Sequence, residues 1–367
     1  MSDPAAPASL RRALLAHLNR DMGAAEAGYR QALENPSLAG VARHHLTRLL
    51  EAQGRWEEAL AQRQAAAAAD PSDLDARMSL GRALLALGRY AEGWPLLEAR
   101  LEQPGMARFK PRVSYPEWDG GPVKSLTVWD EQGSGDTIQF ARCLLTLQER
   151  GIEVTFVCRK ALAPLMRELP IRVIEAERRM EDPAAEAWVM LASLPGRLGE
   201  EFGSLPGHSN YLRPPAERRE AWAKRIGPGL HIGVVTHGNR AHVNDAERSL
   251  PAEAAAFLLT LPAAVTLSPE LSPLPLRDFA DTAAVLEHMA LVITVDTAVA
   301  HLAGAVGRPT WVLLPHLGVD WRWGYQGAES RWYPSARLFR QPGPGDWASV
   351  LQEVAAALPQ FFAESRS

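Results

Sequence analysis

Residues 291–315, LVITVDTAVAHLAGAVGRPTWVLLP, combine a strand, a helix and a second strand in one short stretch. The run 291–296 is apolar until Asp296, which is typical of a strand buried on both faces. Small and apolar residues follow at 297–307 up to a glycine that suits a helix end, and 309–315 is a second buried strand. A strand, a helix and a strand in this order predict a parallel β-sheet.

The same alternation extends outward from this stretch. Strands are expected at 125–129, 152–158, 171–176, 187–194, 231–238, 263–268, 291–296 and 309–315, with helices at 136–151, 281–290, 297–307 and 346–358. These elements predict two Rossmann-like domains, residues 106–225 and 226–367, the second including the final helix. Ligands of such sheets bind outside the carboxyl ends of the strands, so the candidate loops follow Trp129, Thr236, Ser268, Asp296 and Pro315.

Residues 1–105 form a different region, rich in Ala, Leu and Arg, with an internal repeat. A shift of 34 residues places Gly54 over Gly88, and a further shift brings residues 20–36 into register. Leucines at three- and four-residue spacings predict helices. The pattern resembles the tetratricopeptide repeat (TPR), whose stacked helix-turn-helix units offer a concave surface to a peptide or partner protein. The alternative is a helical scaffold that only supports the next domain.

Composition argues against several classes of protein. The 39 basic and 43 acidic residues leave a net charge of −4, which gives no basis for binding nucleic acid or an anionic membrane. No membrane span is expected, since Asp296 and His301 interrupt the most apolar stretch. The start, MSDPAAPASLRR, does not read as a signal peptide. Cys143 and Cys158 lie in apolar runs and are expected to be buried thiols, so a cytoplasmic location is expected.

Asp296 and Thr297 mark the start of the helix at 297–307, and Asp296 is the expected N-cap. The N–H groups of the first turn would then face a diphosphate at the positive end of the helix. His301 lies one turn further on the same face, where it could donate to a phosphate or a sugar hydroxyl. The alternative is a capped helix with a histidine at the edge of the core.

Two other segments carry candidate binding residues. The loop THGNRAHVNDAERSLP (236–251) is dense in side-chain donors, among them Asn239, and its Arg248 suits bidentate contact with phosphate. Its spacing does not fit a metal site, so His242 and Asp245 are expected to be hydrogen-bonding partners. The segment 318–341 sets Trp321 and other aromatics among arginines, which suits stacking on a base or a sugar. A solvated loop and an aromatic plug are the respective alternatives.

The fragment WDEQGSGDTIQFAR (129–142) places a carboxylate at a glycine turn before a helix. It has no lysine, so it is not a P-loop, and GSGD does not match a dinucleotide fingerprint. A carboxylate at such a turn suits a hydroxyl better than an anion, which indicates that Asp136 is a general base for an alcohol. The alternative is a helix cap, and one carboxylate can perform both roles.

Several motifs occur in order: EQGSGDTIQFAR (131–142), RSLP (248–251), DFADTAAV (278–285), the stretch 291–315, DWRW (320–323) and WYPSARLFRQ (332–341). Together they resemble the bacterial glycosyltransferases in which tetratricopeptide repeats precede a GT-B module related to the family 9 heptosyltransferases. Flagellin glycosyltransferases are among them. The resemblance covers essentially the whole chain and implies two Rossmann-like domains facing a cleft, with the acceptor on the side of the first and a nucleotide-sugar donor held by the second.

This resemblance implies an inverting, metal-independent glycosyltransferase that has no cofactor and uses Asp136 as its base. On the donor side the resemblance maps onto Asp296, Thr297 and His301. Together with the loop and the aromatic segment above, the expected donor-binding residues are Gly238, Asn239, Arg248, Asp296, Thr297, His301 and Trp321. The acceptor-side residues are Gln132, Gly133, Ser134, Gly135 and Gln139. A protein similar to flagellin, recruited by the repeats, is the expected acceptor, while the sugar (hexosyl, heptosyl or nonulosonyl) and the nucleotide stay open.

The chain also departs from these relatives. Thr236 and His237 stand where the relatives have a tryptophan and a small residue, and the segment after VTLS (265–268) is short. Both differences fall on the donor side. The short segment favours one alternative, a non-catalytic scaffold or binding protein, whereas the presence of Asp136, Asp296 and His301 together argues against it. A second alternative is a transferase that acts on lipopolysaccharide or capsule glycans.

Overall fold

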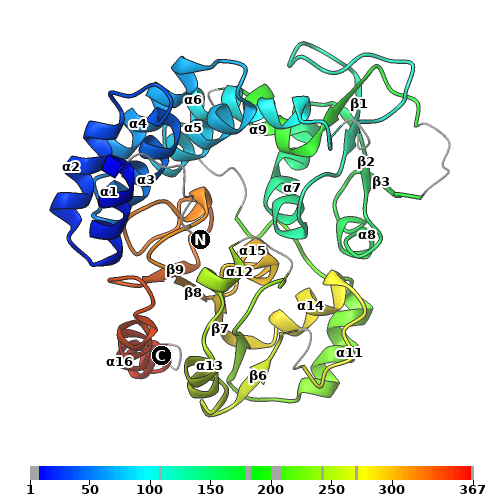
Figure 1. The fold of residues 1–367 in the computed structure, drawn as a ribbon. Coiled ribbons are helices and arrows are strands. Elements are labelled where there is room, and N and C mark those ends of the chain that lie inside the picture. Colours follow the sequence, from blue (N-terminus) through cyan, green and yellow to red (C-terminus); the bar gives the residue numbers. More distant parts are fainter. Residues whose placement is uncertain are drawn as a thin grey trace. The chain divides into compact units, whose positions relative to one another are not determined.

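The chain divides into two compact units. This computed structural model describes residues 8–106, 110–177, 183–199, 209–240, 244–268 and 272–364. Residues Met1–Ala107 form the first unit and Arg108–Ser367 the second. In Figure 1 the helices of the first unit are drawn in blue to cyan, and the second unit continues from cyan to red.

The first unit is entirely helical in its described part. Its helices are α1 (Ala8–Leu18), α2 (Met22–Ala32), α3 (Ala39–Ala52), α4 (Trp56–Ala69), α5 (Leu74–Ala86) and α6 (Tyr90–Leu97), followed by the 3-10 helix η1 (Glu98–Glu102). Each odd-numbered helix packs against the even-numbered helix that follows it, which gives three helix-turn-helix pairs. The core of the first two pairs contains Leu10, Tyr29, Leu46 and Leu50.

A left-handed residue occupies the turn inside each pair. Arg20, Gly54 and Gly88 have φ values of 60°, 71° and 81° and lie 34 residues apart. A glycine adopts this conformation at little steric cost, whereas an arginine does so at about 1 kcal/mol. The turns therefore follow the period expected from the sequence, and assignment to the tetratricopeptide family stays a prediction.

The second unit contains two parallel sheets. The first sheet has the strand order β3-β2-β1-β4 and the second β6-β5-β7-β8-β9. The strands are β1 (Ser125–Trp129), β2 (Glu153–Cys158), β3 (Arg172–Glu175), β4 (Ala187–Met190), β5 (His231–Val235), β6 (Ala264–Thr266), β7 (Met289–Val295), β8 (Thr310–Leu314) and β9 (Ala336–Arg340). The prediction of an α/β fold with parallel sheets is confirmed.

Helices and short 3-10 turns connect these strands. They are α7 (Ser134–Glu149), α8 (Ala163–Met166), η2 (Leu191–Ser193), α9 (Leu194–Arg197), α11 (Ala216–Ile226), α12 (Asp245–Arg248), α13 (Ala252–Leu259), α14 (Phe279–Leu286), α15 (Ala298–Ala305), η3 (Trp321–Trp323) and α16 (Trp347–Glu364). Helices α13 and α16 cover one face of the second sheet with Leu258, Val350 and Val354. No helix in the described ranges is long and apolar enough to cross a membrane.

The strand orders identify one switch point in each sheet. In the first sheet β1 lies between β2 and β4, and in the second sheet β5 lies between β6 and β7. At such a reversal the loops from two neighbouring strands diverge to opposite faces and leave room for a ligand. Asp136, in the first turn of α7, follows β1, and the loops with Asn239 and Thr297 follow β5 and β7. These three predicted site residues therefore lie where this topology favours binding.

Some elements differ from the sequence predictions. The expected strand at 187–194 ends at Met190, because the chain turns there into η2 and α9. The final helix, expected to end at residue 358, continues to Glu364 through Pro359. Strand β9 and helix α11 were not predicted.

Both cysteines are buried free thiols, as predicted. Burial raises the pKa of Cys143 far above its ordinary value and that of Cys158 to about 12.

Candidate active site at the start of α7 and α15

An ion pair fixes the loop after β1. Nε of Arg159 lies 2.5 Å from Oδ2 of Asp130, and Nη2 of Arg159 donates to the carbonyl of Gln132 at 2.8 Å. Thr137 donates its hydroxyl to Oδ1 of Asp130 at 2.5 Å. Gln132 has a φ of 60°, a left-handed conformation that costs about 1 kcal/mol for a residue with a side chain. These contacts hold the loop in a shape that Gln132 by itself disfavours.

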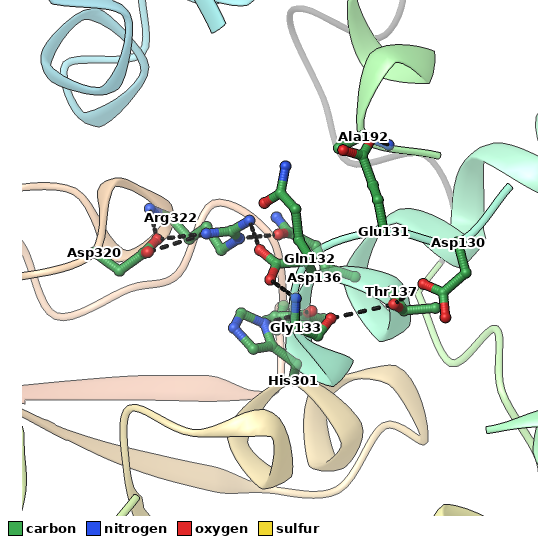
Figure 2. A network of polar contacts seen from close by, with 12 residues as sticks. Asp130, Glu131, Gln132, Gly133, Asp136, Thr137, Ala192, His301, Asp320 and Arg322 are labelled. Carbon is green, nitrogen blue, oxygen red and sulfur yellow. Dashed lines mark hydrogen bonds and ion pairs between the residues drawn. The ribbon is translucent and has the colours of Figure 1, made fainter. Parts of the chain in front are cut away.

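Asp136 has both carboxylate oxygens occupied. Oδ2 accepts the backbone N–H of Gly133 at 2.8 Å, which caps α7, and Oδ1 pairs with Nη2 of Arg322. Figure 2 shows Arg322 reaching Asp136 from one side and Asp320 from the other. The alternative given for Asp136, a helix cap, is present in a different form: Gly133 is the N-cap, and Asp136 bonds back to it from the first turn of α7. The oxygen expected to face an acceptor instead meets a guanidinium from a loop of the second sheet, so the base role stays a prediction.

Arg322 connects the two sheets through two side chains of α7, Asp136 and Gln139, and also pairs with Asp320 of its own loop. Besides Asp136, its Nε donates to Oε1 of Gln139, and its Nη1 lies 2.9 Å and 3.0 Å from the two oxygens of Asp320. The Arg322 side chain is only 8% exposed, and its guanidinium carbon lies 4.4 Å from the centre of the Trp321 ring. Burial by itself lowers the pKa of Arg322, yet the carboxylates of Asp320 and Asp136 raise it above its ordinary value. Arg322 is therefore a fixed cation.

Gln139 contributes an unsatisfied donor next to this cation. Its side chain is fully buried, and its Nε2 has no hydrogen-bond partner among the described residues. A buried amide N–H without a partner costs about 1–3 kcal/mol, so such a group usually has an occupant in the functional state.

Gly135 allows α7 to pack directly on α15. A Cβ at position 135 would lie 2.9 Å from Cδ2 of His301 and 3.4 Å from Cα of Ala298. The contact needs a residue without a side chain, because a Cβ essentially never lies that close to another atom. The glycine turn therefore brings the start of α7 against the start of α15, and Asp136 and His301 meet in one site.

His301 is a buried neutral histidine. Its Nδ1 lies 3.0 Å from the hydroxyl of Tyr333, and its ring stacks on Trp323 with the ring centres 5.1 Å apart. Burial, together with the positive charge of Arg322, lowers the pKa of His301 to about 3. His301 is therefore uncharged at neutral pH and can act there only as a neutral donor or acceptor.

The start of α15 differs from the prediction by one residue. Thr297, and not Asp296, is the N-cap: its hydroxyl accepts the N–H of Val299 at 3.2 Å. Thr297 has the extended conformation of an N-cap, and its short hydroxyl reaches the N–H two residues on. Burial, together with the nearby charge of Asp320, raises the pKa of Asp296 above its ordinary value.

Arg248 ties the loop after β5 to the end of β7. Its Nη1 donates to the carbonyl oxygen of Asp296 at 2.9 Å, and its Nε lies 3.4 Å from Asp245. The guanidinium packs on Gly238, whose N–H donates to Ser249 at 3.2 Å. Asp245 has the hydrogen-bonding role expected for it, and His242 lies outside the described residues.

The aromatic segment forms a plug. Trp321, Trp323, Trp332 and Tyr333 are all buried, and Trp321 meets Trp332 edge to face. Trp321 therefore stacks on protein groups here, which agrees with the alternative given for this segment, and a contact with the donor stays a prediction.

The structure thus brings the predicted residues into two neighbouring groups. In the first group Asp136 and Gln139 contact Arg322, and Gly135 packs on His301. In the second group Arg248, Gly238 and Asp296 meet at the end of β7. Gln132 and Gly133 lie in the exposed part of the loop before α7, and Ser134 is half-buried at the helix start. Sequence reasoning missed Arg322 and Asp320, although both lie in the DWRW motif.

A metal site was not expected. The described part of the chain contains no group of three or more His, Cys, Asp or Glu side chains that could hold a metal ion. A reaction without a metal stays a prediction.

Part of this site matches a known family. Residues 252–313 match the family model described as Glycosyltransferase family 9 (heptosyltransferase). This segment runs from α13 into β8 and contains Asp296, Thr297 and His301. The match therefore supports a glycosyltransferase activity for the second unit, in the part of the chain that includes β7 and most of β8.

One curated relative and two solved structures are similar to larger parts of the chain. Protein FlbA of Caulobacter vibrioides is 30% identical over 363 residues, which cover 84% of this chain and 60% of FlbA. The chain thus spans less than two thirds of that relative.

The solved structures are more distant. A family 9 glycosyl transferase from Veillonella parvula is 14% identical, with a TM-score of 0.48, over 65% of this chain and 97% of its own. The E. coli ADP-heptose LPS heptosyltransferase II is also 14% identical, with a TM-score of 0.45, over 66% of this chain and 100% of its own. Both TM-scores lie below 0.5, so neither structure decides the fold or the activity of this chain.

Proposed function

We propose that this protein is an inverting glycosyltransferase of the GT-B type that uses a nucleotide-sugar donor. One observation carries the proposal: the first turn of α7, which contains Asp136, packs through Gly135 on His301 and Ala298 of α15. These two residues of α15 lie inside the segment that matches a glycosyltransferase family. The donor diphosphate would bind at the start of α15, near Thr297 and Arg248. Helix N-terminal amides and an arginine are both suited to a departing phosphate.

In this proposal Asp136 accepts the proton of an acceptor hydroxyl. The hydroxyl oxygen then attacks the anomeric carbon of the donor, and the bond between that carbon and the diphosphate breaks. The bonding electron pair leaves with the nucleoside diphosphate. Because the hydroxyl attacks from the face opposite this leaving group, the configuration inverts. His301 stays neutral throughout and donates or accepts one hydrogen bond.

A donor screen and one substitution test this activity. Thermal unfolding is measured with UDP-, GDP-, ADP- and CMP-sugars, and the sugar that raises Tm is used in a transfer assay. We expect Asp136→Asn to fold and to bind the donor at least as tightly as wild type, but to lose transfer by about a hundredfold or more, the range of a general base. Transfer at the wild-type rate would reject Asp136 as the base.

The first unit is proposed to recruit a protein acceptor. Its three helix-turn-helix pairs and 34-residue period suit stacked repeats with a peptide-binding surface. The test is to incubate the protein with its donor and either a flagellin-type protein or a lipid-linked glycan. A mass increase of one sugar on the protein supports the proposal, and transfer only to the glycan contradicts it.

A second candidate is a non-catalytic binding protein. The observation that favours it is the occupation of both Asp136 oxygens by Gly133 and Arg322. Such a protein would show no Tm increase with any nucleotide sugar, which separates it from the enzyme in the same screen.

A further inference from the structure

Arg322 faces a position where an anion is expected, and the Asp136 carboxylate of the protein itself fills that position. The side chain is nine-tenths buried and is held between Asp136 of α7 and Asp320 of its own loop. The starts of α7 and α15 also meet here, through Gly135 and Ala298. Each helix start carries about half a positive charge, so three sources of positive potential meet around the Asp136 carboxylate.

We infer that Arg322 is a ligand of the donor diphosphate, and that in the empty protein Asp136 takes the place of the diphosphate beside it. This inference rests on the proposed function and adds a residue and an order of events to it.

The chemistry of Arg322 suits this role. A guanidinium has five N–H donors in a planar fork that matches phosphate oxygens in a bidentate manner. In this structure Nη2 meets one oxygen of Asp136, Nη1 meets Asp320 and Nε meets Gln139. A diphosphate carries more negative charge than one carboxylate, so it can displace Asp136 while Asp320 keeps the arginine in place.

Gln139 gives an independent indication of an occupant. Its Oε1 accepts from Arg322, so its amide orientation is set, and its buried Nε2 is left without a partner among the described residues. An oxygen that bonds to Arg322 from the side of α7 could accept this N–H as well. A phosphate provides such oxygens, and Asp136 does not meet the Nε2.

The exchange links donor binding to the state of the base. While Arg322 holds Oδ1 of Asp136, that oxygen is not available to an acceptor hydroxyl. When the diphosphate takes the guanidinium, Oδ1 becomes free to accept the proton. Arg322 then faces the diphosphate oxygens on which negative charge grows as the bond between the anomeric carbon and the diphosphate breaks. The order is therefore donor first and acceptor second.

A double-mutant cycle on diphosphate binding tests this inference without any measurement of transfer. Binding of inorganic pyrophosphate, ADP, GDP, UDP and CDP to the full chain is measured by calorimetry for wild type, Arg322→Gln, Asp136→Asn and the double variant. We expect Arg322→Gln to weaken binding about tenfold or more, the loss of a charged bidentate contact. Asp136→Asn alone should tighten diphosphate binding about threefold or more. The same substitution should tighten it far less when Arg322→Gln is also present.

Controls separate this role from a merely structural one. Arg337 on β9 is half-exposed and pairs with Glu353, so Arg337→Gln should leave diphosphate affinity within about twofold of wild type. If Arg322→Gln does not fold, Arg322→Lys keeps the charge without the fork and should weaken binding by about threefold. If Arg322 only stabilised the fold, its substitutions would instead lower Tm and leave the diphosphate affinity of the folded protein unchanged.

Three results overturn the inference. These are unchanged affinity in Arg322→Gln, an equal effect of Asp136→Asn in both backgrounds, and no binding of any of the five compounds by folded wild type. If the cycle holds but no sugar is transferred, the proposed function fails and the diphosphate site stands. If transfer occurs without coupling in the cycle, only this inference fails.

Discussion

At Gly135 the backbone of α7 lies in contact with His301 and Ala298 of α15. If alanine replaced Gly135, its methyl group would have to displace the backbone at Ala298 or the buried imidazole of His301, which is stacked on Trp323. Overpacking of this kind usually costs more than an alanine gains in a helix.

Gly135→Ala should therefore destabilise the protein by about 1–3 kcal/mol and weaken diphosphate binding. Gly343→Ala is the control, since no atom lies within 4 Å of a Cβ at that position. Denaturant unfolding measures the stability of both variants, and greater stability of Gly135→Ala would contradict the close contact.

His301 makes stability depend on pH in a defined direction. Its pKa is about 3 in the folded protein and 6.5 in its ordinary state, so the unfolded chain takes up a proton first as the pH falls. The contribution of the neutral histidine is complete above pH 6.5 and is lost as pH falls toward 3.

We expect wild type to lose about 2 kcal/mol more than His301→Gln between pH 7 and pH 5. The difference between the two proteins removes the contribution of Asp296, whose pKa shifts the other way. Unfolding at several pH values checks the size, and histidine NMR should show no titration of His301 above pH 5. Equal pH profiles would contradict the neutral buried state.

Only part of the site could be predicted at the scale of single residues. Asp136, Thr297 and His301 stand beside recognisable turns or helix starts, and local spacing was enough to select them. The pairing of Asp136 with Arg322 joins residues 186 positions apart, and local spacing carries no information about such a contact. The N-cap was misplaced by one residue because Asp296 and Thr297 are both good capping residues.

At the scale of elements, the helical pairs of the first unit depend on their turns. Arg20 holds the same left-handed conformation as Gly54 and Gly88, although its side chain disfavours it. The three positions therefore form a matched set in which the native residue is suited at two and strained at one.

Gly54→Ala and Gly88→Ala should each lower the free energy of unfolding by about 1 kcal/mol, because alanine resists positive φ. Arg20→Gly should be neutral or raise it by up to about 1 kcal/mol, although glycine also loosens the unfolded chain. Chemical denaturation followed by circular dichroism measures all three. If Gly54→Ala and Gly88→Ala left the free energy of unfolding unchanged, the left-handed turns would not explain why glycine recurs at the 34-residue period.

Buried parallel strands were easy to predict, because continuous apolar runs such as 291–295 are typical of them. Strand β9 was missed for the opposite reason. It is an edge strand with Arg337 exposed and Arg340 half-buried, so its sequence lacks a continuous apolar run. Helix α11 buries only Trp222 in its described part and reads as a charged surface segment.

At the scale of the molecule, Arg142 links the parts of the second unit. This fully buried guanidinium donates to the carbonyl oxygens of Gln139 and Trp332 at 3.0 Å and to the Tyr211 hydroxyl at 3.3 Å. Its carbon also lies 5.0 Å from the centre of the Tyr333 ring. The contacts join α7 to the linker before α11 and to the aromatic plug.

Arg142→Met should destabilise the second unit by about 2–4 kcal/mol, since it leaves buried acceptors without a donor. Arg172 is exposed on β3, and Arg172→Met should change stability by no more than about 0.5 kcal/mol. Calorimetry of the full chain compares the two, and equal Tm values would show that Arg142 does not link these parts.

The state of the two cysteines has a practical consequence. Thiolate is the form that reacts with maleimides and iodoacetamide, and both native thiols are enclosed and hold their protons far above neutral pH. The folded chain should therefore react very slowly with such reagents. A single cysteine introduced at an exposed position, such as Gln132 before α7, could carry a fluorophore or spin label with no need to remove the native pair.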